Sequence, residues 1–172
     1  MNTQHPPTAA HAALAFFCFV LFAPTSADAA TATGPMTVTA TVSAVCTVGA
    51  SVLAFPSASS SAIAAGNIDA TGTVTVNCTL NSAYTVALDA GVGGGATLAS
   101  RKMSAGAETL SYAVYTSAAR TTVWGNGSAG SATVAGTGNG AAQSLSAYGR
   151  IFSGQLVSAA AYADTVGVTV TY

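Results

Sequence analysis

Apolar and polar side chains alternate along most of the chain after residue 34, which is the pattern of half-buried β-strands. In the first such stretch, residues 34–46, threonine and serine occupy one face. The opposite face carries Met36, Val38, Ala40 and Val42. The pattern therefore predicts a strand that leads up to Cys46.

The last nine residues, 164–172, repeat this alternation. Their apolar face consists of Val166, Val168, Val170 and Tyr172. An edge strand exposes unpaired N–H and C=O groups, and proteins usually cover or interrupt such edges. Two long, uninterrupted strands at the ends of the chain therefore suggest pairing with a strand of another molecule, through main-chain hydrogen bonds and alternate side chains in pockets.

Between these ends the pattern predicts more strands and no helix. The predicted strands are residues 71–80, 83–91, 109–117, 121–125 and 142–152, with Gly- and Asn-rich breaks between several of them. The first two flank Asn81-Ser82 and are predicted to pair as a hairpin. The Ala/Ser-rich residues 57–65 leave the register of a strand before Gly66 undetermined. Several short strands separated by turns indicate a β-sandwich.

In two of these strands the alternation also predicts which side chains face the core. The inner face of residues 71–80 is predicted to be Val74, Val76, Cys78 and Leu80. The inner face of residues 83–91 is predicted to be Tyr84, Val86 and Leu88. The all-β core would then be built from both sets.

The N-terminal part has the pattern of a secretory signal peptide, residues 1–29. Residues 9–23 are almost wholly apolar, which is shorter than the roughly 20 residues of a membrane span. Ala27-Asp28-Ala29 then supplies a small-x-small site, with cleavage before Ala30. The segment before the apolar run has no Lys or Arg, which departs from the usual pattern. The alternative is a buried helix, but no later segment has helical periodicity to pack against it.

Cleavage at this site leaves Cys46 and Cys78 as the only cysteines and removes both histidines. Two cysteines in an exported chain are expected to form a disulfide, whereas two free buried thiols would be unusual in an oxidising compartment. The mature chain of about 140 residues has the size of one domain.

Charged side chains are few and balanced, with four basic and five acidic residues in the sequence. Without a basic run to neutralise phosphates, nucleic acid is not an expected partner. Apolar residues occur mainly as Ala and Val between Thr, Ser and Gly, which does not favour a membrane protein. An uncharged exterior rich in Thr and Ser suits a protein outside the cell.

Candidate catalytic residues are scarce. Without histidine, the mature chain has no Ser-His-Asp or Cys-His system and no expected zinc site. Asp69, Asp89, Glu108 and Asp164 are scattered singly, which favours solvated acids over a catalytic or calcium-binding pair. Lys102 lies near Ser100 and Ser104, which could in principle form a Ser-Lys catalytic dyad with it, but such adjacency in sequence is common. We therefore expect no enzyme activity, no cofactor and no small-molecule substrate.

Three aromatic residues allow two interpretations. Trp124, Tyr112 and Tyr115 can in principle stack on a sugar ring. Aromatic side chains of a β-sandwich more often fill its core, which is the favoured interpretation.

Several stretches of the sequence together resemble the spore coat protein U family, the subunits of archaic chaperone-usher pili. They include "MTVTATVSAVCTVGA", "GTVTVNC", "YTVALDAG", "LSYAVYTSAARTTVWG", "AYGRI" and "YADTVGVTVTY". The run from Tyr115 to Val123 and the Asp-Thr-Val near the C-terminal end are the most distinctive parts. The resemblance covers essentially the whole mature chain.

The resemblance implies an immunoglobulin-like β-sandwich that lacks its last strand and is completed by a donor strand from a neighbouring subunit. Residues 30–44 would be the N-terminal donor-strand extension, and residues 45–172 the pilin domain. The implied donor side chains are Met36, Val38, Ala40 and Val42, and the implied acceptor groove includes Val166, Val168, Val170 and Tyr172. The disulfide expected from the family maps onto Cys46 and Cys78.

The resemblance further implies a structural subunit that polymerises for surface attachment and biofilm formation. A periplasmic chaperone would hold the groove open, and an outer-membrane usher would order export to the cell surface. Two alternatives remain: a tip adhesin, which would need a receptor-binding domain, and a free-standing surface protein that completes its own sandwich. An enzyme is the least supported class, because catalytic groups are missing from the sequence.

Overall fold

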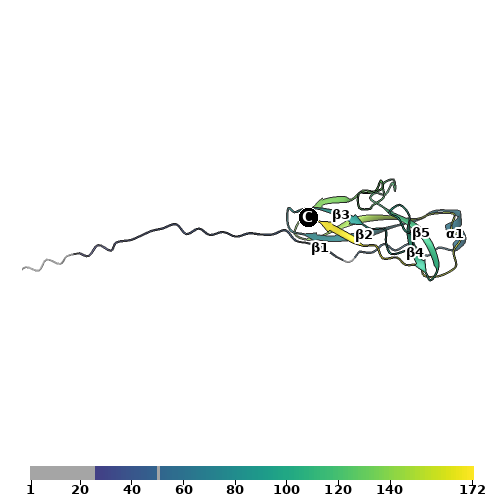
Figure 1. Cartoon of the computed structure of the whole chain (residues 1–172), viewed down its shortest axis with the longest axis horizontal. Helices are drawn as coiled ribbons and strands as arrows, with labels where there is room; N and C mark the ends of the chain where they lie inside the picture. Colours follow the sequence, from purple (N-terminus) through teal and green to yellow (C-terminus); the bar gives the residue numbers. More distant parts are fainter. Residues whose placement is uncertain (1–25, 50) are drawn as a thin grey trace, which may run out of the picture. The chain divides into compact units, whose positions relative to one another are not determined.

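The computed structural model of the chain describes residues 26–49 and 51–172. The apolar run of the predicted signal peptide lies outside the described residues. The chain divides into two compact units, Met1–Ala40 and Thr41–Tyr172, which are described separately. Residues 26–40, the described part of the first unit, form neither helix nor strand (Figure 1). Their side chains are exposed.

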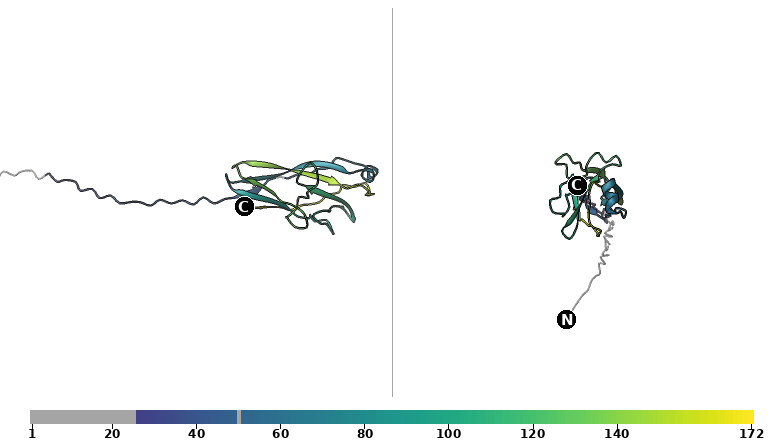
Figure 2. Two further views of the ribbon diagram at one scale, coloured as in Figure 1. Left: turned by 90° about the horizontal axis from the view of Figure 1, so that it is seen from above. Right: turned by 90° about the vertical axis from the view of Figure 1, so that its right-hand side faces the viewer.

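The second unit is a sandwich of two antiparallel sheets, seen as two layers in Figure 2. Its elements are β1 (Cys46–Val48), α1 (Ser60–Ala65), β2 (Ile68–Cys78), β3 (Ala83–Leu88), β4 (Arg101–Ala105), β5 (Glu108–Tyr115), β6 (Val134–Thr137), β7 (Ala142–Ile151) and β8 (Val168–Thr171). One sheet has the strand order β1-β2-β7-β5-β4, and the other has the order β6-β3-β8. The predicted all-β, immunoglobulin-like sandwich is confirmed.

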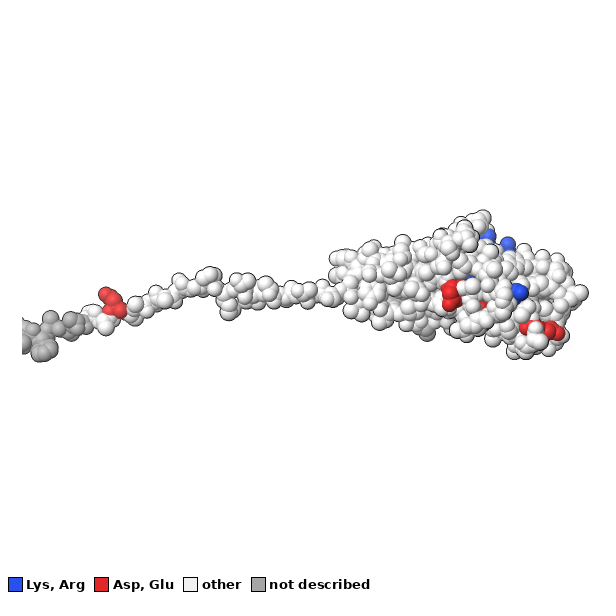
Figure 3. Space-filling model, viewed as in Figure 1, with Lys and Arg blue, Asp and Glu red and all other residues white. Residues whose placement is uncertain are grey.

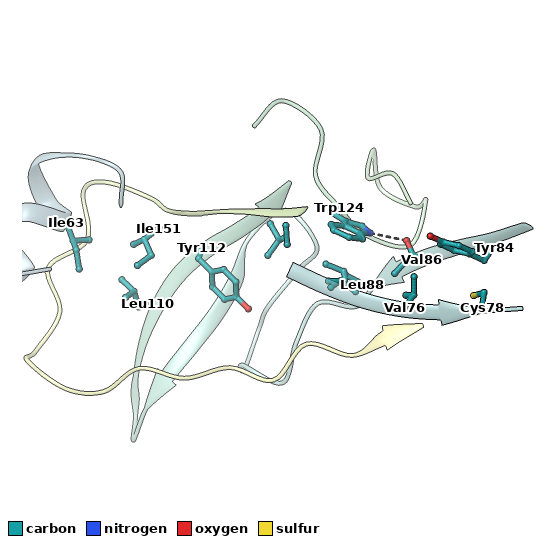
Figure 4. Close-up of a cluster of buried hydrophobic side chains, with 13 residues drawn as sticks. Ile63, Val76, Cys78, Tyr84, Val86, Leu88, Leu110, Tyr112, Trp124 and Ile151 are labelled. Carbon is teal, nitrogen blue, oxygen red and sulfur yellow. Dashed lines mark hydrogen bonds between the residues drawn. The ribbon is translucent and has the colours of Figure 1, made fainter. Parts of the chain in front are cut away.

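The core lies between the two sheets and is supplied by alternate residues of facing strands (Figure 4). Val76 of β2 and Val86 of β3 are fully buried, as the alternation predicts. Trp124 is also fully buried, and its Nε1 donates a hydrogen bond to the carbonyl oxygen of Val86 at 3.0 Å. A buried indole needs such a partner, so the interpretation of Trp124 as a core residue is confirmed.

The predicted hairpin between residues 71–80 and 83–91 is wrong. β2 pairs with β1 and β7, whereas β3 pairs with β6 and β8, so the two strands belong to different sheets. The connection bends at Asn81, which has a φ of 62°, and Asn81 N donates to Gly138 O. The alternation of apolar and polar residues identifies the buried face of a strand, but not the strand it pairs with. Two consecutive strands bury the same faces whether they pair in one sheet or face each other across the core. Leu80, predicted to face inward, follows the end of β2 and is exposed.

Three shorter segments also differ from their predictions. The Ala/Ser-rich segment contains a helix, α1, in place of a strand; Ser59 caps it by accepting a hydrogen bond from Ala62 N, and Ile63 is buried. Residues 121–125 form isolated bridges instead of a strand. Residues 34–45 form no strand within the described chain, and regular pairing begins only at Cys46. α1 has six residues, and no helix in the described ranges is long and apolar enough to cross a bilayer.

The expected disulfide joins Cys46 of β1 to Cys78 of β2, and the two residues are directly paired in the sheet. It ties the short edge strand β1 to the longest strand of the domain. In the chain-entropy model, closing a loop across a sequence separation of 32 contributes about 3 to 4 kcal/mol.

Candidate strand-binding groove

A groove with a volume of about 330 Å³ lies between two segments of the sandwich edge. Residues 51–55 form one wall and follow the edge of β2, where Val52 and Thr73 exchange backbone hydrogen bonds of 3.1 and 3.0 Å. Residues 162–168 form the other wall and lead into β8. β1 and β8 are edge strands of their sheets, so the groove lies along the side where the sandwich is open.

Apolar side chains from both sheets make the floor of the groove. They are Val74, Leu88, Met103, Tyr112, Val114 and Ala147. Leu53 and Phe55 line it from the first wall, and the Phe55 ring packs edge-on against Tyr112 at a centroid distance of 6.0 Å. The groove therefore offers a partly exposed apolar surface continuous with the core.

The structure places two of the four predicted groove residues in the groove. Val166 and Val168 line it, whereas Val170 and Tyr172 do not. Beyond the groove, β8 contacts β1. Tyr172, at the end of the chain, is 58% exposed. The prediction of Val166 and Val168 as lining residues agrees with the geometry, although the binding role of all four remains a prediction.

Sequence reasoning missed the opposite wall and the floor. Leu53 and Phe55 alternate with exposed neighbours, but this pattern extends over only a few residues and lies next to the Ala/Ser-rich segment. Met103 and Tyr112 belong to β4 and β5, which the sequence does not place next to the C-terminal strand.

The backbone of the second wall has an unpaired edge. Asp89 N donates to Gly167 O at 3.0 Å, so Gly167 directs its polar groups toward the end of β3. Backbone groups alternate in direction along a strand, and the register pairs Val168 with Leu88. The N–H and C=O groups of Val166 and Val168 therefore point away from β3, toward the groove.

The first wall has a matching edge. Val52 uses both of its backbone groups in hydrogen bonds to Thr73 of β2. By the same alternation, the backbone groups of Leu53 point away from β2. Among the residues that the structure describes, the backbone groups of Leu53, Val166 and Val168 have no partner, so strand edges border the groove on both sides.

Two carboxylates hold the second wall in place. Asp164 Oδ2 accepts a hydrogen bond from the Tyr112 hydroxyl at 2.7 Å, and Asp164 Oδ1 accepts one from Val92 N at 2.9 Å. Asp89 Oδ1 accepts from Gly91 N and from Gly167 N, both at 2.8 Å. Burial, with the Asp164 hydrogen bond as a further cause, raises the pKa of Tyr112 well above its usual value. The hydroxyl therefore stays protonated and continues to donate.

The other two acids also have defined partners. Asp69 pairs with Arg150 at 2.7 Å, and this hydrogen bond is the main cause that lowers the pKa of Asp69. Glu108 accepts hydrogen bonds from Ser158 and Tyr162, and the Ser158 hydroxyl is the main cause that lowers the pKa of Glu108. Asp69, Asp89 and Glu108 are exposed, in line with the interpretation as solvated acids, whereas Asp164 is half-buried; all four also have hydrogen-bond partners. In the described ranges, no three His, Cys, Asp or Glu side chains gather as potential metal ligands.

The predicted donor side chains are strongly exposed. Met36, Val38 and Val42 have exposed fractions of 84%, 77% and 88%, and Ala40 is also exposed. The role of these side chains as donors remains a prediction.

The fold and the groove define an immunoglobulin-like domain with an open, apolar sandwich edge. The family model of the Spore Coat Protein U domain matches residues 32–169, so the chain belongs to this family. The resemblance noted from the sequence is thereby confirmed.

A solved structure has a similar fold, with a TM-score of 0.54 and 20% sequence identity. It is the complex of the chaperone CsuC with the tip adhesion subunit CsuE, from the archaic chaperone-usher Csu pili of Acinetobacter baumannii. The match covers 77% of this chain and 40% of the other, so the chain corresponds to less than half of its structural relative. No curated protein matches the chain.

Proposed function

We propose that the chain is a structural subunit of an archaic chaperone-usher pilus. After export, residues 30–44 of one copy insert as a donor strand into the groove of a neighbouring subunit, and repetition of this step builds an extracellular fibre for attachment and biofilm formation. A periplasmic chaperone and an outer-membrane usher are the assembly partners. The observation that carries the proposal is the apolar groove bordered by two free strand edges.

The donor and the groove match in length and in pattern. Met36 and Val42 span the same number of residues as the wall 162–168, a distance of about 20 Å for an extended strand. In that conformation the four apolar donor side chains point into the groove, and the threonines point to solvent. The backbone of the donor then pairs with the edges at Leu53 and at Val166 and Val168.

The connection between extension and domain favours a neighbouring subunit over the chain's own groove. Val45 is anchored to the domain, because its carbonyl oxygen accepts from Thr79 N at 2.9 Å and its N–H donates to Thr79 Oγ1 at 2.9 Å. Insertion into its own groove would require residues 41–44 to reverse direction. Ser43 is the one residue of this segment that is common in turns, and the β-branched Thr41 and Val42 disfavour the conformations of a tight turn.

The exposed extension also favours a subunit within the fibre over one at its tip. A tip subunit has no subunit ahead of it to receive a donor strand. The face of the second unit shown in Figure 3 is mostly uncharged, which suits close contact between stacked subunits without charge repulsion. Such a subunit needs no cofactor, small-molecule substrate or nucleic acid, and we do not propose an enzyme activity.

Electron microscopy of the cell surface tests the proposal. Cells that carry the gene are expected to display thin fibres, cells without it are expected to lack them, and a plasmid copy should restore them. Labelling with an antibody to the domain should decorate the fibres along their length. Fibres that persist without the gene, or labelling confined to the fibre tip, would contradict the assignment as a fibre subunit.

A further inference from the structure

We infer that Asp89 and Asp164 are positioning residues of the groove, which hold the wall segment 163–167 in the form that an incoming strand binds. This inference rests on the proposed function of the groove. The two residues do not need to touch the donor themselves, because they act through the backbone that the donor meets.

The wall segment crosses from one sheet to the other within a few residues. At its start, Ser104 N donates to Ala163 O at 2.8 Å and Ala163 N donates to Ser104 O at 3.1 Å, which joins Ala163 to β4 of the five-stranded sheet. At its end, Gly167 O accepts from Asp89 N beside β3 of the three-stranded sheet. A segment that crosses between two sheets cannot pair with either sheet along its whole length. Its backbone N–H and C=O groups therefore need other hydrogen-bond partners.

The carboxylates supply those partners. Thr165 N donates to Asp164 Oδ1 at 2.8 Å, and Gly167 N donates to Asp89 Oδ1 at 2.8 Å. Asp164 also accepts from Val92 N and from the Tyr112 hydroxyl. These bonds connect the wall to the loop after β3 and to the floor of the groove. Hydrogen bonds to charged acceptors are among the stronger ones in proteins.

Two glycines make room for the two carboxylates. A Cβ atom on Gly91 would overlap the Asp164 carboxylate, and a Cβ atom on Gly167 would overlap the Asp89 carboxylate. Gly91 also has a φ of +82°, which a residue with a side chain rarely adopts. A side chain at either position would displace the carboxylate opposite it, so glycine at both positions lets the carboxylates keep their hydrogen bonds.

A buried arginine stabilises the same loop from the other side. Arg101 is fully buried, and its Nε donates to Asp89 O while Nη2 donates to Trp124 O, both at 2.8 Å. Burial is the main effect on the pKa of Arg101 and lowers it, whereas Tyr112, Asp89 and Asp164 act in the opposite direction. A buried charge requires compensation of this kind, so the two acids and Arg101 support each other.

A wall segment that is already ordered before the donor strand binds lowers the entropy cost of binding. Val166 and Val168 present the backbone groups that a donor strand pairs with; Val166 lies within the anchored segment and Val168 follows it directly. A wall that moves freely would have to be ordered by the incoming strand, and this entropy loss would weaken the complex. Loss of the carboxylate contacts should therefore reduce donor binding more than it disturbs the rest of the sandwich.

The experiment uses the full chain carrying Val38→Asp, which disables its own donor strand. The probe is a fluorescent synthetic peptide with the sequence of residues 34–44, and binding is measured by anisotropy. Adding Asp164→Asn to this chain is expected to weaken peptide binding about tenfold, because at least one hydrogen bond to a charged acceptor is lost. Asp69→Asn is the matched control, because Asp69 pairs with Arg150 and does not line the groove. It should change binding by less than about twofold.

Hydrogen exchange separates positioning from general destabilisation. In the parent chain, the peptide should protect the amides of Val166 and Val168, and Asp164→Asn should reduce this protection while the amides of β2 and β7 stay unchanged. Tyr112→Phe removes one of the contacts and keeps the ring, so an intermediate loss of binding is expected.

Three results would overturn the inference, and they differ in whether they also contradict the proposed function of the groove. If the parent chain does not bind the peptide, the proposed function of the groove fails as well. If the parent binds and Asp164→Asn binds equally well, only the positioning role is lost. A uniform loss of protection across β2, β7 and the groove would assign Asp164 to general stability instead.

Discussion

Residues 34–45 and 162–172 carry the same alternation of apolar and polar side chains, yet they differ in structure. The C-terminal segment leads into β8, which pairs with β3 and places alternate valines half-buried. The N-terminal segment forms no strand within the described chain, and Val38 and Val42 are exposed. A sequence pattern thus specifies the capacity to form a strand, whereas a strand forms only where an edge is available to pair with it.

The largest expected effect tests the unpaired segment. Val38→Asp would place a carboxylate in the apolar groove of a neighbour, at a cost of several kcal/mol, and should abolish fibres in electron micrographs. Thr39→Asp is the control, because this side chain would face solvent in the same strand. The circular dichroism of the domain should be unchanged in both variants. Equal loss of fibres, or an unfolded domain with Val38→Asp, would mean that the segment belongs to its own sandwich.

The second prediction concerns the junction between extension and domain. Cys46→Ser removes the disulfide that ties β1 to β2, and we expect the free energy of unfolding to fall by about 2 to 5 kcal/mol. Denaturant unfolding of the variant beside the oxidised parent measures this change. In the native parent, neither Cys46 nor Cys78 should react with a thiol reagent, and labelling of both would refute the bond.

The third prediction applies the same test to the paired segment. Val168 is half-buried and lines the groove, so Val168→Asp should destabilise the domain by about 2 kcal/mol. Thr169→Asp, on the exposed face of β8, should cost less than about 0.5 kcal/mol. Thermal unfolding of the two variants gives the comparison. Unlike Val38→Asp, the Val168 change should therefore lower the stability of the subunit itself.

The smallest expected effect concerns a charged pair outside the groove. The Arg150 hydrogen bond lowers the pKa of Asp69, so its contribution to stability is present above the pKa of the unfolded chain and is lost as the pH falls through the lower folded value. Asp69 is partly exposed, which limits the contribution to below about 1 kcal/mol. Unfolding measured between pH 6 and about pH 2 should show a weaker pH dependence for Asp69→Asn than for the parent. An unchanged pH profile would show that the pair contributes nothing.

The sequence predicted the sandwich class, the disulfide and most of the buried faces. Val74, Val76 and Cys78 in β2, and Tyr84, Val86 and Leu88 in β3, are buried as their alternation indicates. These features follow from the two-residue side-chain period of a strand, which is a local property of the chain. The family resemblance added the expectation of an open groove and a donor segment.

The tertiary structure decided which strands pair and which side chains meet. The assignment of β2 and β3 to different sheets depends on contacts with β7 and β8, far away in the sequence, and alternation carries no information about them. The opposite wall at Leu53 and Phe55, and the anchoring of residues 163–167 by Asp89 and Asp164, arise for the same reason. A single acid has no periodicity, so its role becomes visible only when the fold places backbone N–H groups beside it.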